Sequence, residues 1–155
     1  MTQADEIAQI RAEFIEKIGM IAQNEGLPRI AGRVLATLVY DGERASFGAL
    51  AERLEVSRGS ISSSVRLLED RQIIKRVAKP GDRQDYFELA EDAFVTLIET
   101  SALRARRAYK DIAGTLAKLP LSESGPHGRL KDYADFYDVI DAALTDAAKE
   151  MRNRR

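Results

Sequence analysis

Apolar residues recur at helical spacing near the start of the chain. They fall three or four positions apart on one stripe, at Ile7, Ile10, Phe14, Ile18 and Ile21. This spacing predicts a helix over residues 5–25. Gly26 and Pro28 come directly afterwards, and a glycine followed by a proline is typical of a helix end. A second apolar stripe predicts a helix over residues 29–40, and the turn pair Asp41-Gly42 ends it.

Two shorter apolar stripes follow, and each comes after a serine. Ser46 is the predicted N-cap of a helix over residues 47–54, and Ser57 that of a helix over about 58–71. A serine hydroxyl suits both places because it accepts a hydrogen bond from a free backbone N–H group at a helix start. The connection, residues 55–57, is tight. Two short helices joined by three residues indicate a helix-turn-helix.

The hydrophobic pattern then changes its period. Residues 73–78 and 85–89 are rich in β-branched and aromatic side chains and are predicted to be strands. The segment between them, residues 79–84, contains Pro80-Gly81, which favours a turn. A hairpin that directly follows a helix-turn-helix indicates a winged helix-turn-helix.

Two long helices are predicted to complete the chain. One runs from about residue 91 to 118, and the other is expected to begin at Pro126, since proline suits a first helical position. The second helix carries an apolar seam whose steps alternate between three and four: Leu130, Tyr133, Tyr137, Ile140, Leu144, Ala147 and Met151. Such a seam contacts another helix. We expect that helix to belong to a second copy of the chain, because so small a domain has little core to cover both long helices. Packing within one chain is the alternative.

Composition narrows the chemistry. The 155 residues include no cysteine and one histidine, His127, which is expected in an exposed loop. No thiolate site, Ser-His-Asp triad or metal-ligand spacing is available, so we expect no enzyme, no cofactor and no metal. The longest mainly apolar run, residues 34–40, contains one threonine and is too short to cross a membrane. The N-terminus has no apolar signal segment, and a cytoplasmic protein is expected.

Charge is distributed unevenly along the chain. The formal net charge is −1, which by itself does not favour nucleic acid as a partner. Residues 57–85, however, hold seven basic and four acidic residues, a net of +3. The residues before and after this segment are together acidic. The second short helix and the hairpin are therefore the part of the chain that attracts phosphate.

The helix over 58–71 has a polar face opposite its apolar stripe. Small residues and one arginine occupy that face, and small side chains let the backbone approach the floor of a DNA groove. These face residues, the residues at the start of the helix and two cations of the hairpin together form the predicted DNA-binding set. The set consists of Ser57, Arg58, Gly59, Ser60, Ser62, Ser63, Arg66, Lys79 and Arg83. A solvated helix face, and hairpin cations that protect strand edges, are the alternatives.

The predicted fold class is mainly α with a small β-hairpin wing, a winged helix-turn-helix flanked by long dimerisation helices. Three regions are expected. Residues 1–28 form an N-terminal helical arm for dimerisation, residues 29–90 the winged helix-turn-helix DNA-binding domain, and residues 91–155 a C-terminal helical dimerisation region. Four aromatic residues are candidates for a small-molecule effector pocket: Phe14, Tyr109, Tyr133 and Tyr137. The alternative is that they belong to the ordinary core.

The winged-helix segment resembles the MarR-type repressors. The resemblance is carried by residues 50–62 and 67–76, and it is closest to the GbsR-like branch through residues 26–33, 56–62 and 76–86. It implies a homodimeric transcriptional regulator that reads DNA with the second short helix and the wing. Gln72 stands where such proteins usually have glycine, so the turn there is expected to differ. The segment from Asp82 to Leu89 is shorter than the usual wing.

Two functions of different class remain open at this point. The first is a homodimeric repressor that binds double-stranded DNA at a pseudo-palindromic operator and is released by a small-molecule effector. The second is a winged-helix module for protein–protein contact without DNA binding. That module would present an apolar or acidic face, whereas the face predicted here is small, polar and basic.

Overall fold

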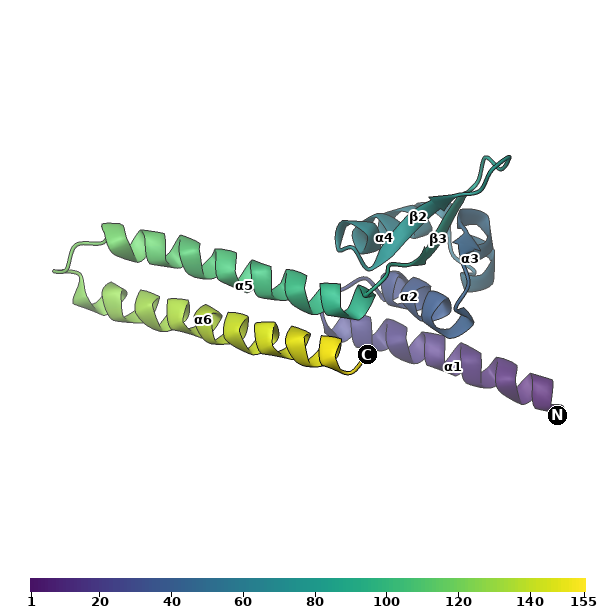
Figure 1. Ribbon diagram of the computed structural model, residues 1–155, viewed down its shortest axis with the longest axis horizontal. Coiled ribbons are helices and arrows are strands. Elements are labelled where there is room, and N and C mark those ends of the chain that lie inside the picture. Colours follow the sequence, from purple (N-terminus) through teal and green to yellow (C-terminus); the bar gives the residue numbers. More distant parts are fainter. The chain divides into compact units, whose positions relative to one another are not determined.

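The computed structural model describes residues 1–155 and divides them into two compact units, Met1–Ala93 and Phe94–Arg155. Six helices and three short strands make up the chain, which confirms the predicted mainly α fold class with a small β wing (Figure 1). The division into the three regions 1–28, 29–90 and 91–155 stays a prediction. Each unit is described in turn.

The first unit opens with α1, Gln3–Asn24, which begins two residues earlier than predicted. Thr2 provides the reason, because its hydroxyl oxygen accepts a hydrogen bond from the Asp5 N–H at 3.2 Å. The Asp5 carboxylate in turn accepts one from the Thr2 N–H at 2.9 Å, which completes a capping box. At the other end Gly26 takes the left-handed conformation (φ 85°) and turns the chain, as expected.

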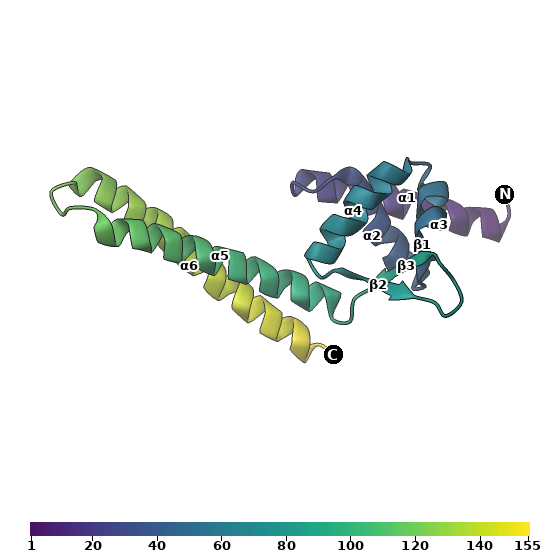
Figure 2. The same cartoon turned by 90° about the horizontal axis from the view of Figure 1, so that it is seen from above.

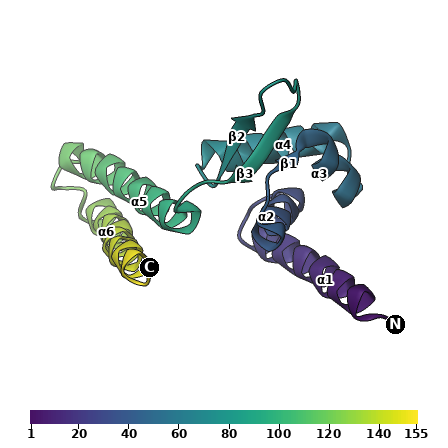
Figure 3. The same ribbon diagram turned by 45° about the vertical axis from the view of Figure 1, so that its right-hand side comes forward.

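The second helix, α2, Arg29–Asp41, packs against α1 at a close crossing (Figure 3). Gly32 lies at the point of contact. A Cβ on Gly32 would lie 2.5 Å from the Cβ of Ala22 and 2.8 Å from the carbonyl oxygen of Ile18. Only glycine lets the two helix backbones come this near, so the crossing depends on this residue.

The helix-turn-helix consists of α3, Phe47–Leu54, and α4, Arg58–Asp70. Both predicted serine caps are confirmed. The hydroxyl oxygen of Ser46 accepts from the Ala49 N–H, and that of Ser57 from the Ser60 N–H, each at 3.1 Å. Behind α4, Gln72 adopts a left-handed backbone with φ 59°. Glycine takes this conformation without strain, so Gln72 forms the turn at a small conformational cost.

The sheet has three antiparallel strands in the order β1-β3-β2. The wing strands are β2, Ile74–Ala78, and β3, Asp85–Leu89, in a register that pairs Ile74 with Leu89 and Ala78 with Asp85. The predicted hairpin is confirmed, with its first strand one residue shorter. The strand β1, Ala45–Ser46, was not predicted, because two residues carry no detectable alternation. Phe87 is fully buried between the sheet and the helices, and it belongs to the core with Leu38, Leu50, Ile61 and Leu68.

The second unit is an antiparallel pair of helices, α5, Ala93–Lys118, and α6, Ser124–Asn153 (Figure 2). Helix α6 begins two residues before Pro126, so the prediction that Pro126 is the first helical residue was wrong. Proline is tolerated here because the first backbone N–H groups of a helix have no partner within it. His127 accordingly lies within the helix and is half-buried, not in an exposed loop.

Small residues form the contact between α5 and α6. Ala102 and Ala105 on α5, and Ala134 and Ala148 on α6, are all nearly buried. The predicted seam of α6 lies beside this line of alanines and not on it, because its residue Tyr133 remains 51% exposed. Part of that seam is therefore not covered by α5.

Candidate nucleic-acid interface

Helix α4 separates its buried and exposed residues as the sequence predicts. The buried stripe consists of Ile61, Ser64, Val65 and Leu68. The opposite side carries the predicted DNA-binding residues of this helix, which are exposed or half-exposed: Ser57, Arg58, Gly59, Ser60, Ser62, Ser63 and Arg66. This surface is small and polar and contains no acid.

The hydroxyl groups on that surface differ in their freedom to bind a base. Ser57 donates to the Ser60 hydroxyl at 3.0 Å, and Ser63 donates to the Gly59 carbonyl oxygen at 3.1 Å. The hydroxyl hydrogens of Ser57 and Ser63 are thus already donated to hydrogen bonds at the start of the helix. Ser62 and Arg66 form no hydrogen bond or ion pair in the structure. They are the two side chains best able to exchange water for a base edge.

A concave surface lies beside the start of α4. It is a cavity of about 370 Å³ formed by α3, α4 and the wing, and it is lined by Phe47, Gly48, Arg58, Arg83, Gln84 and Asp85. The Arg58 guanidinium lies over the Phe47 ring, 5.4 Å from its centroid, which limits its motion. Arg58 and Arg83 reach this cavity from different elements, and both are free of ion pairs. Together they suit a phosphate of the DNA backbone.

The wing tip is ordered by its own side chains. Asp82 accepts hydrogen bonds from the Gln84 N–H at 2.9 Å and from the Tyr86 hydroxyl at 2.7 Å. The Tyr86 hydrogen bond lowers the pKa of the Asp82 carboxyl, and the same bond raises the pKa of Tyr86. The Lys79 ammonium lies 5.5 Å from the centroid of the Tyr86 ring. The tip therefore presents Lys79 and Arg83 from a defined loop.

The other two hairpin cations are paired with acids. Lys75 lies 3.3 Å from Glu88, and Arg76 lies 3.0 Å from both Glu69 and Asp85. Sequence reasoning did not name Phe47, Asp82 or Tyr86 for this interface. The contact of Phe47 with Arg58 lies between elements, and no local motif signals it. The bonds of Asp82 to Gln84 and Tyr86 are local, and the turn that Asp forms with the N–H two residues on is a signal that could have indicated Asp82.

The four residues of the predicted effector pocket are divided between the two units. Phe14 packs on Tyr40, with ring centroids 5.8 Å apart. Tyr133 and Tyr137 stack along α6 with their hydroxyl oxygens 3.3 Å apart, and their contact raises the pKa of Tyr137. Tyr109 is half-buried on α5. A shared pocket for these residues stays a prediction.

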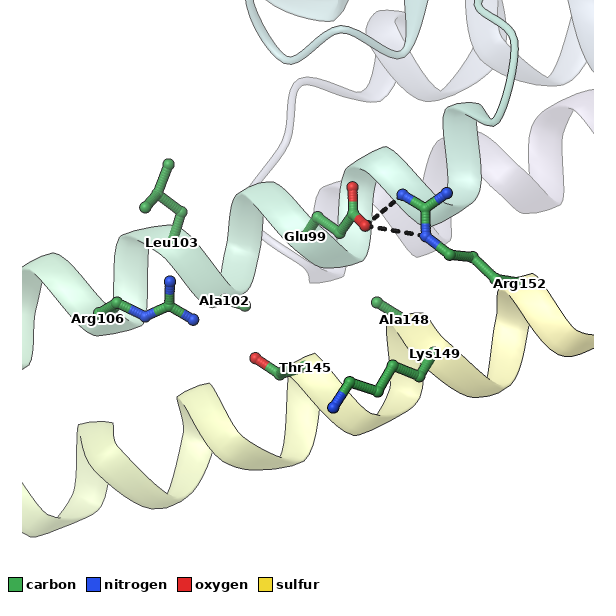
Figure 4. Close-up of a pocket in the computed structure, with 8 residues that line it drawn as sticks. All are labelled: Glu99, Ala102, Leu103, Arg106, Thr145, Ala148, Lys149 and Arg152. Atoms are coloured by element: carbon green, nitrogen blue, oxygen red, sulfur yellow. Dashed lines mark hydrogen bonds and ion pairs between the residues drawn. The ribbon is translucent and has the colours of Figure 1, made fainter.

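A separate groove runs between α5 and α6 (Figure 4). Its volume is about 340 Å³, and it is lined by Glu99, Ala102, Leu103, Arg106, Thr145, Ala148, Lys149 and Arg152. Two ion pairs cross it. Arg106 donates twice to Asp141, at 2.9 and 3.0 Å, and Arg152 donates to Glu99. None of the predicted pocket residues lines this groove.

No group of three or more histidine or acidic side chains is arranged to hold a metal ion. None of the six helices is both long enough and apolar enough to pass through a lipid bilayer.

Comparison with known proteins places these features in a family. The family model described as "MarR family" matches residues 25–85, which contain the helix-turn-helix and most of the wing. The HTH-type transcriptional regulator MmpR5 of Mycobacterium tuberculosis is 35% identical over 145 residues, which is 92% of this chain and 87% of that protein. The HTH-type transcriptional repressor OpcR of Bacillus subtilis is 29% identical over 101 residues, 65% of this chain and 55% of that protein.

A solved structure shares the fold as well. A crystal structure of a transcriptional regulator superposes with a TM-score of 0.80 at 29% identity, and the match covers 92% of this chain and 98% of that one. Three observations agree. They are the sequence identity to MmpR5 over most of both chains, the family match over the winged helix, and the exposed basic face of α4. The chain belongs to the MarR family of DNA-binding transcriptional regulators.

Proposed function

We propose that a homodimer of this chain represses transcription by placing two copies of α4 in successive major grooves of a pseudo-palindromic operator. The observation that carries this proposal is the polar face of α4, where Ser62 and Arg66 have no partner within the protein. Arginine and serine are side chains that read base edges. A twofold axis then sets the two half-sites about one helical turn apart.

The phosphate contacts are assigned to the rim of that face. Arg58 and Arg83 line one cavity, and Lys79 stands on the ordered wing tip. We assign these three cations to the DNA backbone, where they set the register of α4 without reading sequence.

The homodimer is supported by apolar side chains that the chain leaves exposed. On α1, Ile7 and Ile10 are 51% and 59% exposed, and on α6 Phe136 and Val139 are 54% and 66% exposed. Exposed apolar residues clustered in this way mark an interface. We assign both helices to contact with a second copy, as the sequence predicts.

The proposal has three further parts. The protein represses transcription, an effector releases it from DNA, and it acts in the cytoplasm. OpcR, one of the relatives, carries the name of a repressor. An effector would act by favouring a spacing of the two α4 helices that does not fit the operator. The GbsR-like branch of the family stays a prediction from residues 26–33, 56–62 and 76–86.

The test is a titration of DNA from upstream of the protein's own gene, with fluorescence anisotropy at two salt concentrations. We expect specific binding that weakens steeply as salt increases, because each phosphate contact releases counterions. Sedimentation equilibrium on the same sample is expected to give a dimer. A monomer that binds no upstream fragment would contradict the proposal, and would favour the protein–protein module.

A further inference from the structure

Arg76 on β2 contacts both elements assigned to DNA, and contacts them through different atoms. Its Nη2 donates to Glu69 on α4 and its Nη1 donates to Asp85 on β3, each at 3.0 Å. Its guanidinium carbon lies 5.3 Å from the centroid of the Phe87 ring. One side chain thus joins the end of α4, the wing and the core.

The ring beneath Arg76 extends the connection to the start of α4. Phe87 is fully buried, and its centroid lies 6.5 Å from that of Phe47. The guanidinium carbon of Arg58 in turn lies 5.4 Å from the centroid of the Phe47 ring. A row of contacts from Arg76 through Phe87 and Phe47 to Arg58 therefore connects the wing with both ends of α4. The guanidinium of Arg76 donates from this row to two carboxylates, one on β3 and one on α4.

The charge of Arg76 is already paired within the protein, although half of its side chain is exposed. Two carboxylates at 3.0 Å surround it, so the local net charge is −1. The hydrogen bond that Arg76 donates to Glu69 raises the pKa of Arg76 still further, so the side chain remains charged and paired. Lys79 and Arg83 are exposed as well, but they form no ion pair. The four hairpin cations thus divide into two without an ion pair, Lys79 and Arg83, and two that are paired with acids, Lys75 and Arg76.

We propose that Arg76 is a positioning residue that braces the wing against α4, so that both reach DNA in one geometry, and that it does not bind DNA phosphate. This inference rests on the proposed function. Helix α4 and the wing must contact DNA at the same time. A wing that moves freely has to be ordered on binding, and the free-energy cost of that ordering lowers the affinity for DNA. An ion pair that only protects a strand edge would leave DNA affinity unchanged when it is removed.

The decisive variants are Glu69→Ala and Asp70→Ala. Each removes one negative charge from adjacent positions at the end of α4, but only Glu69 contacts Arg76, while Asp70 is exposed and unpaired. Electrostatics alone predicts tighter DNA binding for both variants. The brace predicts that Glu69→Ala weakens binding about threefold, whereas Asp70→Ala binds as the wild type does or more tightly.

A second pair of variants separates bracing from simple charge. Arg76→Lys keeps the positive charge but has one nitrogen, which cannot bridge two carboxylates in the same way. We expect it to weaken binding about threefold with an unchanged slope of log affinity against log salt. Lys79→Ala, by comparison, is expected to reduce that slope by about 1. Equal affinity for wild type, Arg76→Lys and Glu69→Ala would overturn the inference.

Hydrogen exchange of the backbone amides between Val77 and Asp85 supplies a readout that does not need DNA. Faster exchange in Glu69→Ala than in Asp70→Ala, at matched thermal stability, is expected from the brace. If the wild type binds no DNA, the proposed function fails while this measurement still decides whether the brace exists. Identical exchange in the two variants overturns it.

Discussion

Arg11 on α1 and Asp41 at the end of α2 form an ion pair through two parallel hydrogen bonds. Nε of Arg11 lies 2.7 Å from Oδ1 of Asp41, and Nη2 lies 2.7 Å from Oδ2. Arg53 of α3 approaches the same carboxylate at 3.5 Å. One acid therefore joins the N-terminal helix to the helix-turn-helix. Paired, partly buried carboxylates of this kind contribute more than isolated surface ion pairs.

Asp41→Asn is expected to lower the free energy of unfolding by about 1 kcal/mol at neutral pH, because the arginines lose their charged partner. Urea unfolding followed by circular dichroism measures this. Glu43→Gln is the matched control, since Glu43 is exposed nearby and forms no ion pair. An equal loss in the two variants would show that the Arg11 contact contributes nothing specific.

The same ion pair predicts a dependence of stability on pH. The hydrogen bond from Arg11 lowers the pKa of the Asp41 carboxyl in the folded chain. Its stabilisation is therefore complete above the unfolded pKa of aspartate, about 3.9, and is lost as the pH falls through the lower folded pKa. The difference in unfolding free energy between wild type and Asp41→Asn should shrink as the solution is acidified through this range. A constant difference would contradict the assignment.

Gly32→Ala is expected to destabilise the first unit by about 2 kcal/mol, because the new Cβ would lie 2.5 Å from that of Ala22. Thermal unfolding measures the effect. Gly114→Ala is the control, since nothing lies within 4 Å of its added Cβ. In α5 that change should stabilise the helix by up to about 1 kcal/mol. Destabilisation by both variants alike would rule out close packing as the reason for glycine at position 32.

Ser57→Ala should lower the stability of the protein, because it removes the N-cap of α4. The Ser57 hydroxyl oxygen accepts from the Ser60 N–H at 3.1 Å, and loss of such a cap costs about 1 kcal/mol. We therefore expect a lower melting temperature. Ser62→Ala, which removes an unpartnered hydroxyl, should leave the melting temperature unchanged. A melting temperature that falls equally in both variants would argue against a capping role for Ser57.

Arg66→Ala should reduce affinity for the operator by about 1–3 kcal/mol and relax the preference at one base pair, if Arg66 binds a base. A series of operators with single substitutions, measured by anisotropy, identifies that base pair. Lys79→Ala should instead weaken all sequences alike. Uniform weakening by Arg66→Ala would move this arginine from the bases to the backbone.

Val139→Asp should dissociate the proposed dimer, because it places a charge on the exposed apolar face of α6, where Val139 is 66% exposed. Sedimentation velocity across a range of concentrations measures the shift towards monomer. Leu121→Asp is the control, since Leu121 is 84% exposed in the turn between α5 and α6. Dimers of unchanged strength in Val139→Asp would remove this face from the interface.

Local signals in the sequence predicted most of the winged helix. Ser46 and Ser57 cap α3 and α4 at the predicted positions, because a cap is encoded within four residues. Pro126 misled the placement of α6, since proline fits any position in a first helical turn. The strand β1 escaped prediction because its two residues pair only with the distant β3.

The roles of charged residues were less accessible. Arg76 and Lys79 look alike in the sequence, and both are exposed, yet Arg76 is paired with Glu69 and Asp85 whereas Lys79 forms no ion pair. This difference depends on acids that lie seven and nine positions away from Arg76. Charge counted along the chain located the basic segment but did not reveal which cations were already neutralised.

The freedom of Ser62 and Arg66 has a consequence for how this regulator can change its targets. Neither side chain contributes to the stability of the fold. Ser57 is the N-cap of α4, and Ile61, Val65 and Leu68 pack into the core. If these two side chains read base pairs as proposed, substitutions at positions 62 and 66 alter the recognised base pairs at little cost in stability. Duplicated copies of such a gene could acquire new operators by changes at these two positions, while the scaffold stays intact.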